Sequence, residues 1–173
     1  YSPEGELLER EITEIDWDAD TAEKQGYETF MLKEINEQAD AVAETIGERA
    51  ARGWGIDLGL VPADTPIDDA FLTDLKRVVI VACGTAYHAG LIGRYAIEQW
   101  ARVPVEVDVA SEYRYRNPVV GPDDLVIGIS QSGETADTLA AMRTARQRGA
   151  KVLAVTNVMG AQATREADGV LYT

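Results

Sequence analysis

The sequence has few of the residues that build redox and metal sites. Its 173 residues include one cysteine, Cys83, and one histidine, His88. A single cysteine excludes an internal disulfide and is typical of a chain that works in a reducing compartment. No HxH, HExxH or CxxC pattern occurs, so the sequence predicts no metal site. We therefore expect a cytoplasmic protein that needs no metal and no other cofactor.

Long apolar runs are also missing. The longest strongly apolar run, residues 78–83, has six residues, whereas a helix needs about 20 to cross a bilayer. The first residues, Tyr1-Ser2-Pro3-Glu4, show neither the basic start nor the apolar core of a signal peptide. The sequence thus predicts no membrane partner.

Positive charge is scarce and unevenly distributed. The chain has 16 basic and 30 acidic residues, a net charge of −14. Residues 1–75 contain 20 of the acidic and five of the basic residues, whereas residues 76–173 contain 10 and 11. No basic patch with interleaved aromatic residues occurs, so nucleic acid is not an expected partner. Because the second part is close to neutral, it can hold an anionic ligand that a uniformly acidic domain would repel.

The spacing of apolar residues divides the first part of the chain in two. Residues 1–25 are acidic and extended, and we interpret them as the end of a preceding domain followed by a linker. Residues 26–75 are predicted to form leader helices. Apolar side chains recur there every three or four residues, from Met31 to Ile46, which predicts a helix that ends near Arg52. A short helix is expected at residues 68–75, and the chain as a whole reads as a piece of a longer protein.

From residue 76 onward, strand and helix patterns alternate. Residues 78–82 have no polar interruption, which is typical of a parallel strand buried on both faces. The alternation predicts a doubly wound α/β domain at residues 76–173, with a five-stranded parallel sheet in the order 2-1-3-4-5. The expected strands are residues 78–82, 105–109, 125–129, 151–155 and 169–172, and the expected helices are residues 85–101 and 135–148.

The loop after the third predicted strand has the composition of a phosphate-binding loop. In a sheet of this order, the ligand crevice opens between the ends of strands 1 and 3. Ser130-Gln131-Ser132-Gly133-Glu134-Thr135 opens onto a helix, whose first backbone N–H groups favour anions. Three hydroxyls and an amide add donors, and Gly133 allows the backbone to approach a ligand closely. The alternative is a simple helix cap, for which one hydroxyl would suffice.

The loop after the first predicted strand, Cys83-Gly84-Thr85-Ala86, is expected to lie beside it. Gly84 and Thr85 either line the pocket or only cap the next helix, and both interpretations stay open. Cys83 has no evident basic neighbour to activate it as a nucleophile. His88, one turn into the helix, is expected to be structural.

Together these motifs resemble a known family. The loop at residues 130–135 resembles the signature loop of sugar isomerase (SIS) domains. The sequence as a whole resembles the glucosamine-6-phosphate synthases. Besides the loop, this resemblance is carried by Ala82-Cys83-Gly84-Thr85, residues 110–116 and the leader pieces at residues 14–18 and 30–35. These are glutamine–fructose-6-phosphate aminotransferases with an isomerase part. The resemblance spans nearly the whole chain and implies the end of the glutaminase domain and linker at residues 1–25 and the first SIS domain at residues 76–173.

This resemblance also implies an activity. The family takes ammonia from glutamine and converts fructose 6-phosphate into glucosamine 6-phosphate as a homodimer. Its catalytic groups lie in domains outside this sequence, so we expect no catalytic residue here and no turnover by this piece alone. The resemblance implies phosphate contacts from Ser130, Gln131, Ser132 and Thr135, and a sugar pocket lined by Cys83, Gly84 and Thr85. Ala86 stands where relatives often have serine.

Three other functions remain open. A sugar-phosphate isomerase or deglycase has the same SIS pair without a glutaminase domain, but residues 1–25 resemble the exit from such a domain. A module that senses sugar phosphates without chemistry often follows a helix-turn-helix domain, for which the acidic leader is a poor candidate. A flavodoxin-like protein has its hydroxyl-rich loop after the first strand rather than after the third.

Overall fold

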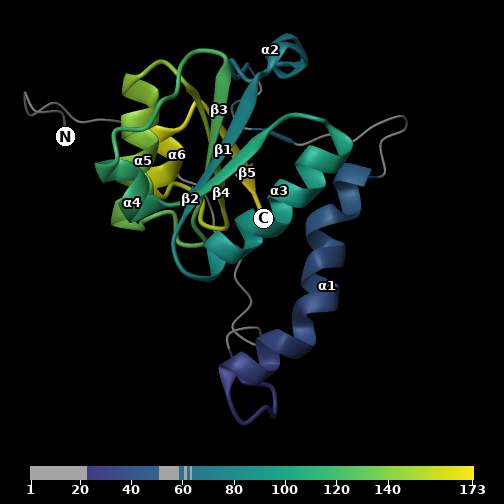
Figure 1. Ribbon diagram of the computed structural model, residues 1–173. Helices are drawn as coiled ribbons and strands as arrows, with labels where there is room; N and C mark the ends of the chain where they lie inside the picture. The colour runs from purple at the N-terminus through teal and green to yellow at the C-terminus, as the bar shows by residue number, and fades with distance from the viewer. Residues whose placement is uncertain (1–22, 51–58, 61, 63) are drawn as a thin grey trace, which may run out of the picture. The chain divides into compact units, whose positions relative to one another are not determined.

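The computed structural model describes residues 23–173 except residues 51–58, 61 and 63, and the chain falls into two compact units, residues 1–48 and 49–173 (Figure 1). Helix α1 (Phe30–Ala50), most of which belongs to the first unit, confirms the predicted leader helix. Thr29 Oγ1 accepts a hydrogen bond from the Leu32 N–H near its start. The predicted end near Arg52 and the predicted linker before residue 23 lie outside the described residues.

The second unit confirms the predicted alternation of strands and helices. The five strands and the two long helices lie within about one residue of their expected bounds. Two short helices, α4 and α6, were not predicted. Helices of five or six residues are too short for an apolar repeat to become visible in a sequence. The elements are α2 (Asp69–Asp74), β1 (Arg77–Ala82), α3 (Thr85–Trp100), β2 (Val105–Val109), α4 (Ala110–Tyr115), β3 (Asp124–Ile129), α5 (Ala136–Gln147), β4 (Lys151–Thr156), α6 (Gln162–Glu166) and β5 (Gly169–Tyr172).

The sheet is parallel throughout, and its order is β2-β1-β3-β4-β5, as predicted. Its register aligns the carboxyl ends of the central strands. Ala82 of β1 pairs with Ile129 of β3, and Ile129 pairs with Val155 of β4. The loops that leave β1, β3 and β4 therefore begin side by side at one edge of the sheet.

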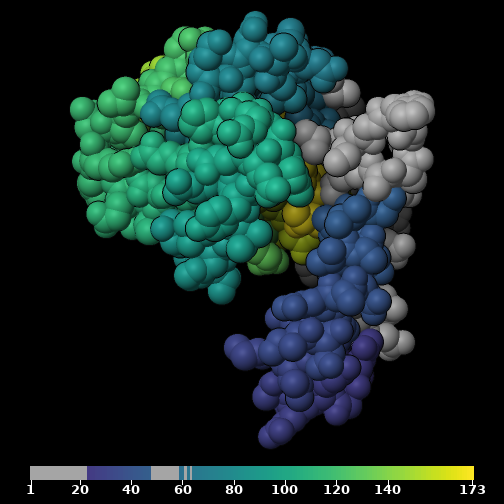
Figure 2. Space-filling model, turned by 45° about the vertical axis from the view of Figure 1, so that its right-hand side comes forward, coloured from purple at the N-terminus to yellow at the C-terminus, as the bar shows by residue number. Residues whose placement is uncertain are grey.

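Helices cover both faces of this sheet (Figure 1). One face packs against α4, α5 and α6, where Val79, Val126 and Met142 are completely buried. The other face packs against α2 and α3, and Ile67 and Ile80 belong to its core. Figure 2 shows α2 and α3 in blue-green over this face, with yellow residues of the C-terminal end visible beside them. No helix in the described part of the chain is long and apolar enough to cross a membrane.

Helix α5 sits directly on β3 because the strand has a glycine at the contact. A Cβ atom built on Gly128 would lie 2.5 Å from the sulfur of Met142. This close approach fixes the height of α5 above the sheet. It thereby also fixes the position of the N-terminus of α5, which follows the hydroxyl-rich loop.

Candidate functional site

The structure brings the two predicted loops together. Because Ala82 pairs with Ile129, Cys83 and Ser130 are the next residues on two neighbouring parallel strands. Ser130 is buried, and Cys83 is half-buried. Of the other predicted site residues, Thr135 is half-buried, whereas Gln131, Ser132, Gly84 and Thr85 are exposed. The predicted residues therefore line one edge of the sheet, at the carboxyl ends of β1 and β3.

Hydroxyl groups tie the loop at residues 130–135 to itself. Ser130 Oγ accepts a hydrogen bond from the Gly133 N–H at 3.1 Å and lies 2.9 Å from Thr135 Oγ1. Ser132 Oγ accepts from the Glu134 N–H at 3.2 Å. Thr135 is the residue before α5, but its side chain makes no capping bond to that helix. The interpretation of Thr135 as a simple helix cap therefore fails. The Ser132 hydroxyl accepts a hydrogen bond inside the turn and still has a proton to donate.

Gly133 is required by its neighbours in the fold. Its φ of +65° is in the left-handed region, and a Cβ there would lie 2.5 Å from Ala161 Cβ and 3.0 Å from Thr156 Oγ1. The sequence predicts that Gly133 allows the backbone to approach an anion closely, and this stays a prediction. The structure shows that the space on the Cβ side is filled by Ala161 and Thr156.

The segment between β4 and α6 holds the loop from behind. The Gln131 carbonyl accepts hydrogen bonds from the Asn157 N–H and from Thr156 Oγ1, both at 3.2 Å. The Gly133 carbonyl accepts from the Ala163 N–H at 2.9 Å. Carbonyl oxygens repel anions, so these bonds turn two unfavourable groups of the loop toward the protein. The sequence analysis did not identify this segment, although the predicted strand order places the end of β4 beside the end of β3.

Comparison with known proteins agrees with this geometry. The SIS domain profile matches residues 71–173. The chain belongs to the SIS domain family. Over all 173 of its residues, this SIS protein is 54% identical to the "Glutamine--fructose-6-phosphate aminotransferase [isomerizing]" of Clostridium acetobutylicum, of which it spans 28%. It is also 55% identical over 159 residues, 92% of the chain, to the protein of that name from Mycolicibacterium paratuberculosis, of which the match spans 25%.

Solved structures confirm the SIS fold. The C-terminal domain of glucosamine-fructose-6-phosphate aminotransferase from Francisella tularensis superposes with a TM-score of 0.74 at 41% identity, over 87% of this chain and 41% of that one. A putative phosphosugar isomerase from Bacillus subtilis superposes with a TM-score of 0.54 at 32% identity, over 60% of this chain and 34% of that one. The chain spans little more than a quarter of the length of the curated relatives that it matches.

Helix α6 of the SIS domain is itself anchored on two sides. A carboxylate oxygen of Glu134 accepts a hydrogen bond from the Gln162 N–H at 2.7 Å, which ties the first residue of α6 to the hydroxyl-rich loop. At the other end, Glu166 lies 2.9 Å from a guanidinium nitrogen of Arg143 on α5. The hydrogen bond from Arg143, followed by one from Gln162, lowers the pKa of the Glu166 carboxyl below its ordinary value of 4.5.

This anchor predicts a dependence of stability on pH. The lowered pKa means that ionised Glu166 stabilises the SIS domain above pH 4.5, and that this contribution is lost as the pH falls through the lower folded-state pKa. We expect Glu166→Gln to lower the thermal unfolding midpoint at pH 7, and we expect this difference from the parent chain to shrink as the pH falls below 4.5 through the lowered pKa of the carboxyl. Glu112→Gln removes an exposed carboxylate of α4 as the matched control. A difference for Glu166→Gln that is as large at low pH as at pH 7 would contradict this assignment.

The chemistry available where the loops at residues 83–86 and 130–135 meet is that of binding. These two loops offer hydroxyl, amide and backbone N–H donors but contain no lysine, histidine or arginine. His88 lies exposed on α3 with its ring edge-on to Tyr87, 5.7 Å between centroids. Within the described residues, no group of three histidine, cysteine or acidic side chains is placed to hold a metal ion. The arrangement can bind and orient an anion, and we assign no catalytic residue to this chain.

Proposed function

We propose that the loop at residues 130–135 binds the phosphate of a hexose 6-phosphate. The observation that carries this proposal is where the polar groups of the loop make their hydrogen bonds. The carbonyls of Gln131 and Gly133 are bonded to the segment behind the loop, and Thr135 bonds to Ser130 instead of capping α5. The N-terminus of a twelve-residue helix is thereby left to a ligand, with its partial positive charge and unpaired N–H groups.

The predicted residues have different roles in this proposal. Exposed Gln131 and Ser132 donate directly to the phosphate, whereas Ser130 and Thr135, which bond to each other, place a hydroxyl pair at the base of the loop. The sugar lies along the end of the neighbouring strand β1, where it contacts Cys83, Gly84 and Thr85. Because all these donors are neutral, binding rests on oriented dipoles and hydrogen bonds to a charged acceptor.

We further propose that the whole protein makes glucosamine 6-phosphate from fructose 6-phosphate and glutamine. The match to the aminotransferases of Clostridium species extends over residues 1–70, outside the SIS match, which favours this function over that of an isomerase built from SIS domains alone. In this proposal residues 1–25 end a glutaminase domain, residues 26–75 are leader helices and residues 76–173 are the first SIS domain. The protein is then a cytoplasmic homodimer, and groups outside this chain perform the chemistry.

Thermal unfolding with added ligands tests the binding proposal. A ligand present at ~100 times its dissociation constant adds about 2.7 kcal/mol to the free energy of unfolding, which moves the midpoint by several degrees. We expect fructose 6-phosphate and glucose 6-phosphate to give this shift and free fructose to give none. Inorganic phosphate separates the contribution of the phosphate from that of the sugar.

Variants show whether the loop is responsible. Ser132→Ala is expected to abolish the shift, because it removes a donor from the loop. Thr144→Ala is the matched control, since the Thr144 hydroxyl bonds only to the Ala140 carbonyl of its own helix, α5. Hexose phosphates that stabilise Ser132→Ala as much as the parent chain would place the phosphate elsewhere.

A further inference from the structure

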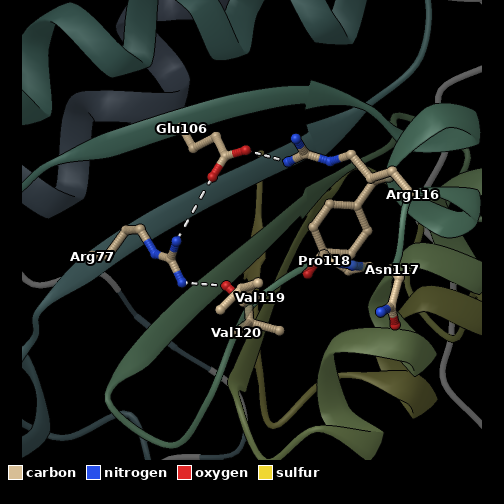
Figure 3. A pocket seen from close by; sticks show the side chains of 8 residues that line it. Arg77, Glu106, Arg116, Asn117, Pro118, Val119 and Val120 are labelled. Atoms are coloured by element: carbon tan, nitrogen blue, oxygen red, sulfur yellow. Dashed lines mark hydrogen bonds and ion pairs between the residues drawn. The ribbon is translucent and has the colours of Figure 1, made fainter.

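A separate pocket lies at the opposite end of the sheet. It has a volume of about 250 Å³ and is lined by Arg77, Glu106, Tyr113, Arg116 and residues 117–120 (Figure 3). Arg77 is the first residue of β1, whereas the crevice loops follow the last residues of β1 and β3. The length of β1 separates the two places by roughly 16 Å. The pocket is therefore not part of the phosphate site.

The pocket contains a buried hydroxyl without a partner. Tyr113 has no exposed surface, and its hydroxyl makes no hydrogen bond to any described residue. Burial raises the pKa of this phenol to about 12, and the charges of Arg148, Glu106, Arg116 and Arg77 act on it as well. Tyr113 lines the pocket, and so do three of these four charged groups. The phenol stays neutral at physiological pH and is a donor without an acceptor.

The two arginines also have unused donors. Arg77 binds Asp124 through Nε and Nη2, at 3.2 and 2.9 Å, but its Nη1 comes only within 3.8 Å of Glu106. Arg116 bonds to Glu106 through Nη2, and its Nε lies 2.7 Å from a carboxylate oxygen of Asp108. Figure 3 shows both guanidinium groups converging on Glu106 from opposite sides. The Nη1 atom of each guanidinium has no hydrogen-bond acceptor among the described residues.

The remaining wall is apolar and is held in place by two arginines. Pro118, Val119 and Val120 supply it, on the segment that leads from α4 to β3. From within the pocket, Arg77 Nη2 donates to the Val119 carbonyl (Figure 3). Arg148 of the α5 C-terminus donates to the Pro118 carbonyl at 2.5 Å and to the side-chain oxygen of Asn117. The pocket thus presents three unused donor groups on one side, small apolar side chains on the other, and a single carboxylate.

We propose that this pocket is a second ligand site, which binds a small oxyanion, a carboxylate or a phosphoryl group, with a short apolar portion. The oxyanion accepts hydrogen bonds from the Tyr113 hydroxyl and from the Nη1 groups of Arg77 and Arg116. Planar guanidinium groups match the geometry of carboxylate and phosphate oxygens well. The apolar portion packs against the wall at residues 118–120. A pocket of 250 Å³ is smaller than most drug-sized sites, which limits the ligand to a small acid. This site does not depend on the proposed sugar-phosphate function.

An NMR titration of the isotope-labelled chain tests the proposal with two probes, butyrate and inorganic phosphate, at ionic strength matched with sodium chloride. We expect saturable shifts of the backbone amides of Arg116, Val119 and Val120. Tyr113→Phe keeps the ring that packs in the core and removes only the hydroxyl, so the fold is retained. It is expected to weaken binding at least about tenfold, the effect of losing a hydrogen bond to a charged group. Ser132→Ala, in the other loop, is expected to leave these shifts unchanged.

Each outcome has a defined meaning. Shifts with phosphate alone identify a phosphoryl ligand, and shifts with butyrate alone identify a carboxylate. The proposal is overturned if neither probe moves these amides saturably, or if Tyr113→Phe binds as tightly as the parent chain. Phosphate that moves only the amides of Gly133 and Glu134 supports the sugar-phosphate site and overturns this one.

Discussion

Gly133→Ala is expected to destabilise the SIS domain by roughly 2–4 kcal/mol and to abolish phosphate binding. A side chain at a φ of +65° costs about 1 kcal/mol or more. The added Cβ also meets Ala161 Cβ at 2.5 Å, and overpacking of this kind costs about 1–3 kcal/mol. The loop has to move away from the segment that holds it, so its donors lose their arrangement. Chemical denaturation and a titration with fructose 6-phosphate measure the two effects.

Gly160→Ala is the matched control for this change. Gly160 has a similar φ of +72°, but a Cβ there meets nothing within 4 Å. It should therefore show the backbone cost of about 1 kcal/mol and keep phosphate binding. Adding Ala161→Gly to Gly133→Ala removes the clashing atom and should restore part of the stability. If Gly133→Ala and Gly160→Ala behave alike, the contact with Ala161 does not shape the loop.

The second large effect is expected at the contact between α5 and β3. Met142→Ala removes a completely buried side chain and should cost about 2–5 kcal/mol. Gly128→Ala places a Cβ 2.5 Å from the Met142 sulfur and should cost about 1–3 kcal/mol by overpacking. Both changes alter the position of α5 on the sheet. Because the N-terminus of α5 moves with the helix, both should weaken phosphate binding.

The two changes should compensate each other when combined. In the double variant, the Cβ at position 128 occupies part of the space that the Met142 side chain leaves empty. We expect the cost of the double variant to be smaller than the sum of the single costs by about 1 kcal/mol or more, as measured by a double-mutant cycle in denaturant. Additive costs would mean that α5 does not rest on β3 at this point.

The sheet could be predicted from local patterns, whereas parts of the helical layers could not. Residues 78–82 are apolar without interruption because β1 is an inner strand, paired on both edges and covered on both faces. Helices α3 and α5 are long enough to show a repeat. Helices α4 and α6 have only six and five residues, and their place depends on contacts with α5 and β4 rather than on their own pattern.

In the candidate site, too, some features could be predicted from the sequence and others could not. The hydroxyl-rich loop is visible in the sequence because its donors and its glycine are consecutive. Its support is not visible, since the bonds from Asn157, Gln162 and Ala163 join residues about 25–30 positions apart. The close approach of the Gly133 backbone to an anion stays a prediction, whereas its packing against Ala161 and Thr156 could not be seen in the sequence. The second pocket depends on an unsatisfied hydroxyl, which no sequence pattern reports.

The long sequence separations in the sheet have a consequence for synthesis on the ribosome. Strand β1 is made first, yet its partners β2 and β3 begin 28 and 47 residues later. Until residue 129 has emerged, β1 is an apolar segment with an unpaired edge, and nonlocal parallel pairing of this kind is slow and exposed to aggregation. The hydroxyl-rich loop at residues 130–135 forms later still, because the residues that hold it extend to Ala163. A nascent chain that stops before residue 163 therefore has the sequence of the hydroxyl-rich loop but lacks the bond from Ala163 that holds its shape.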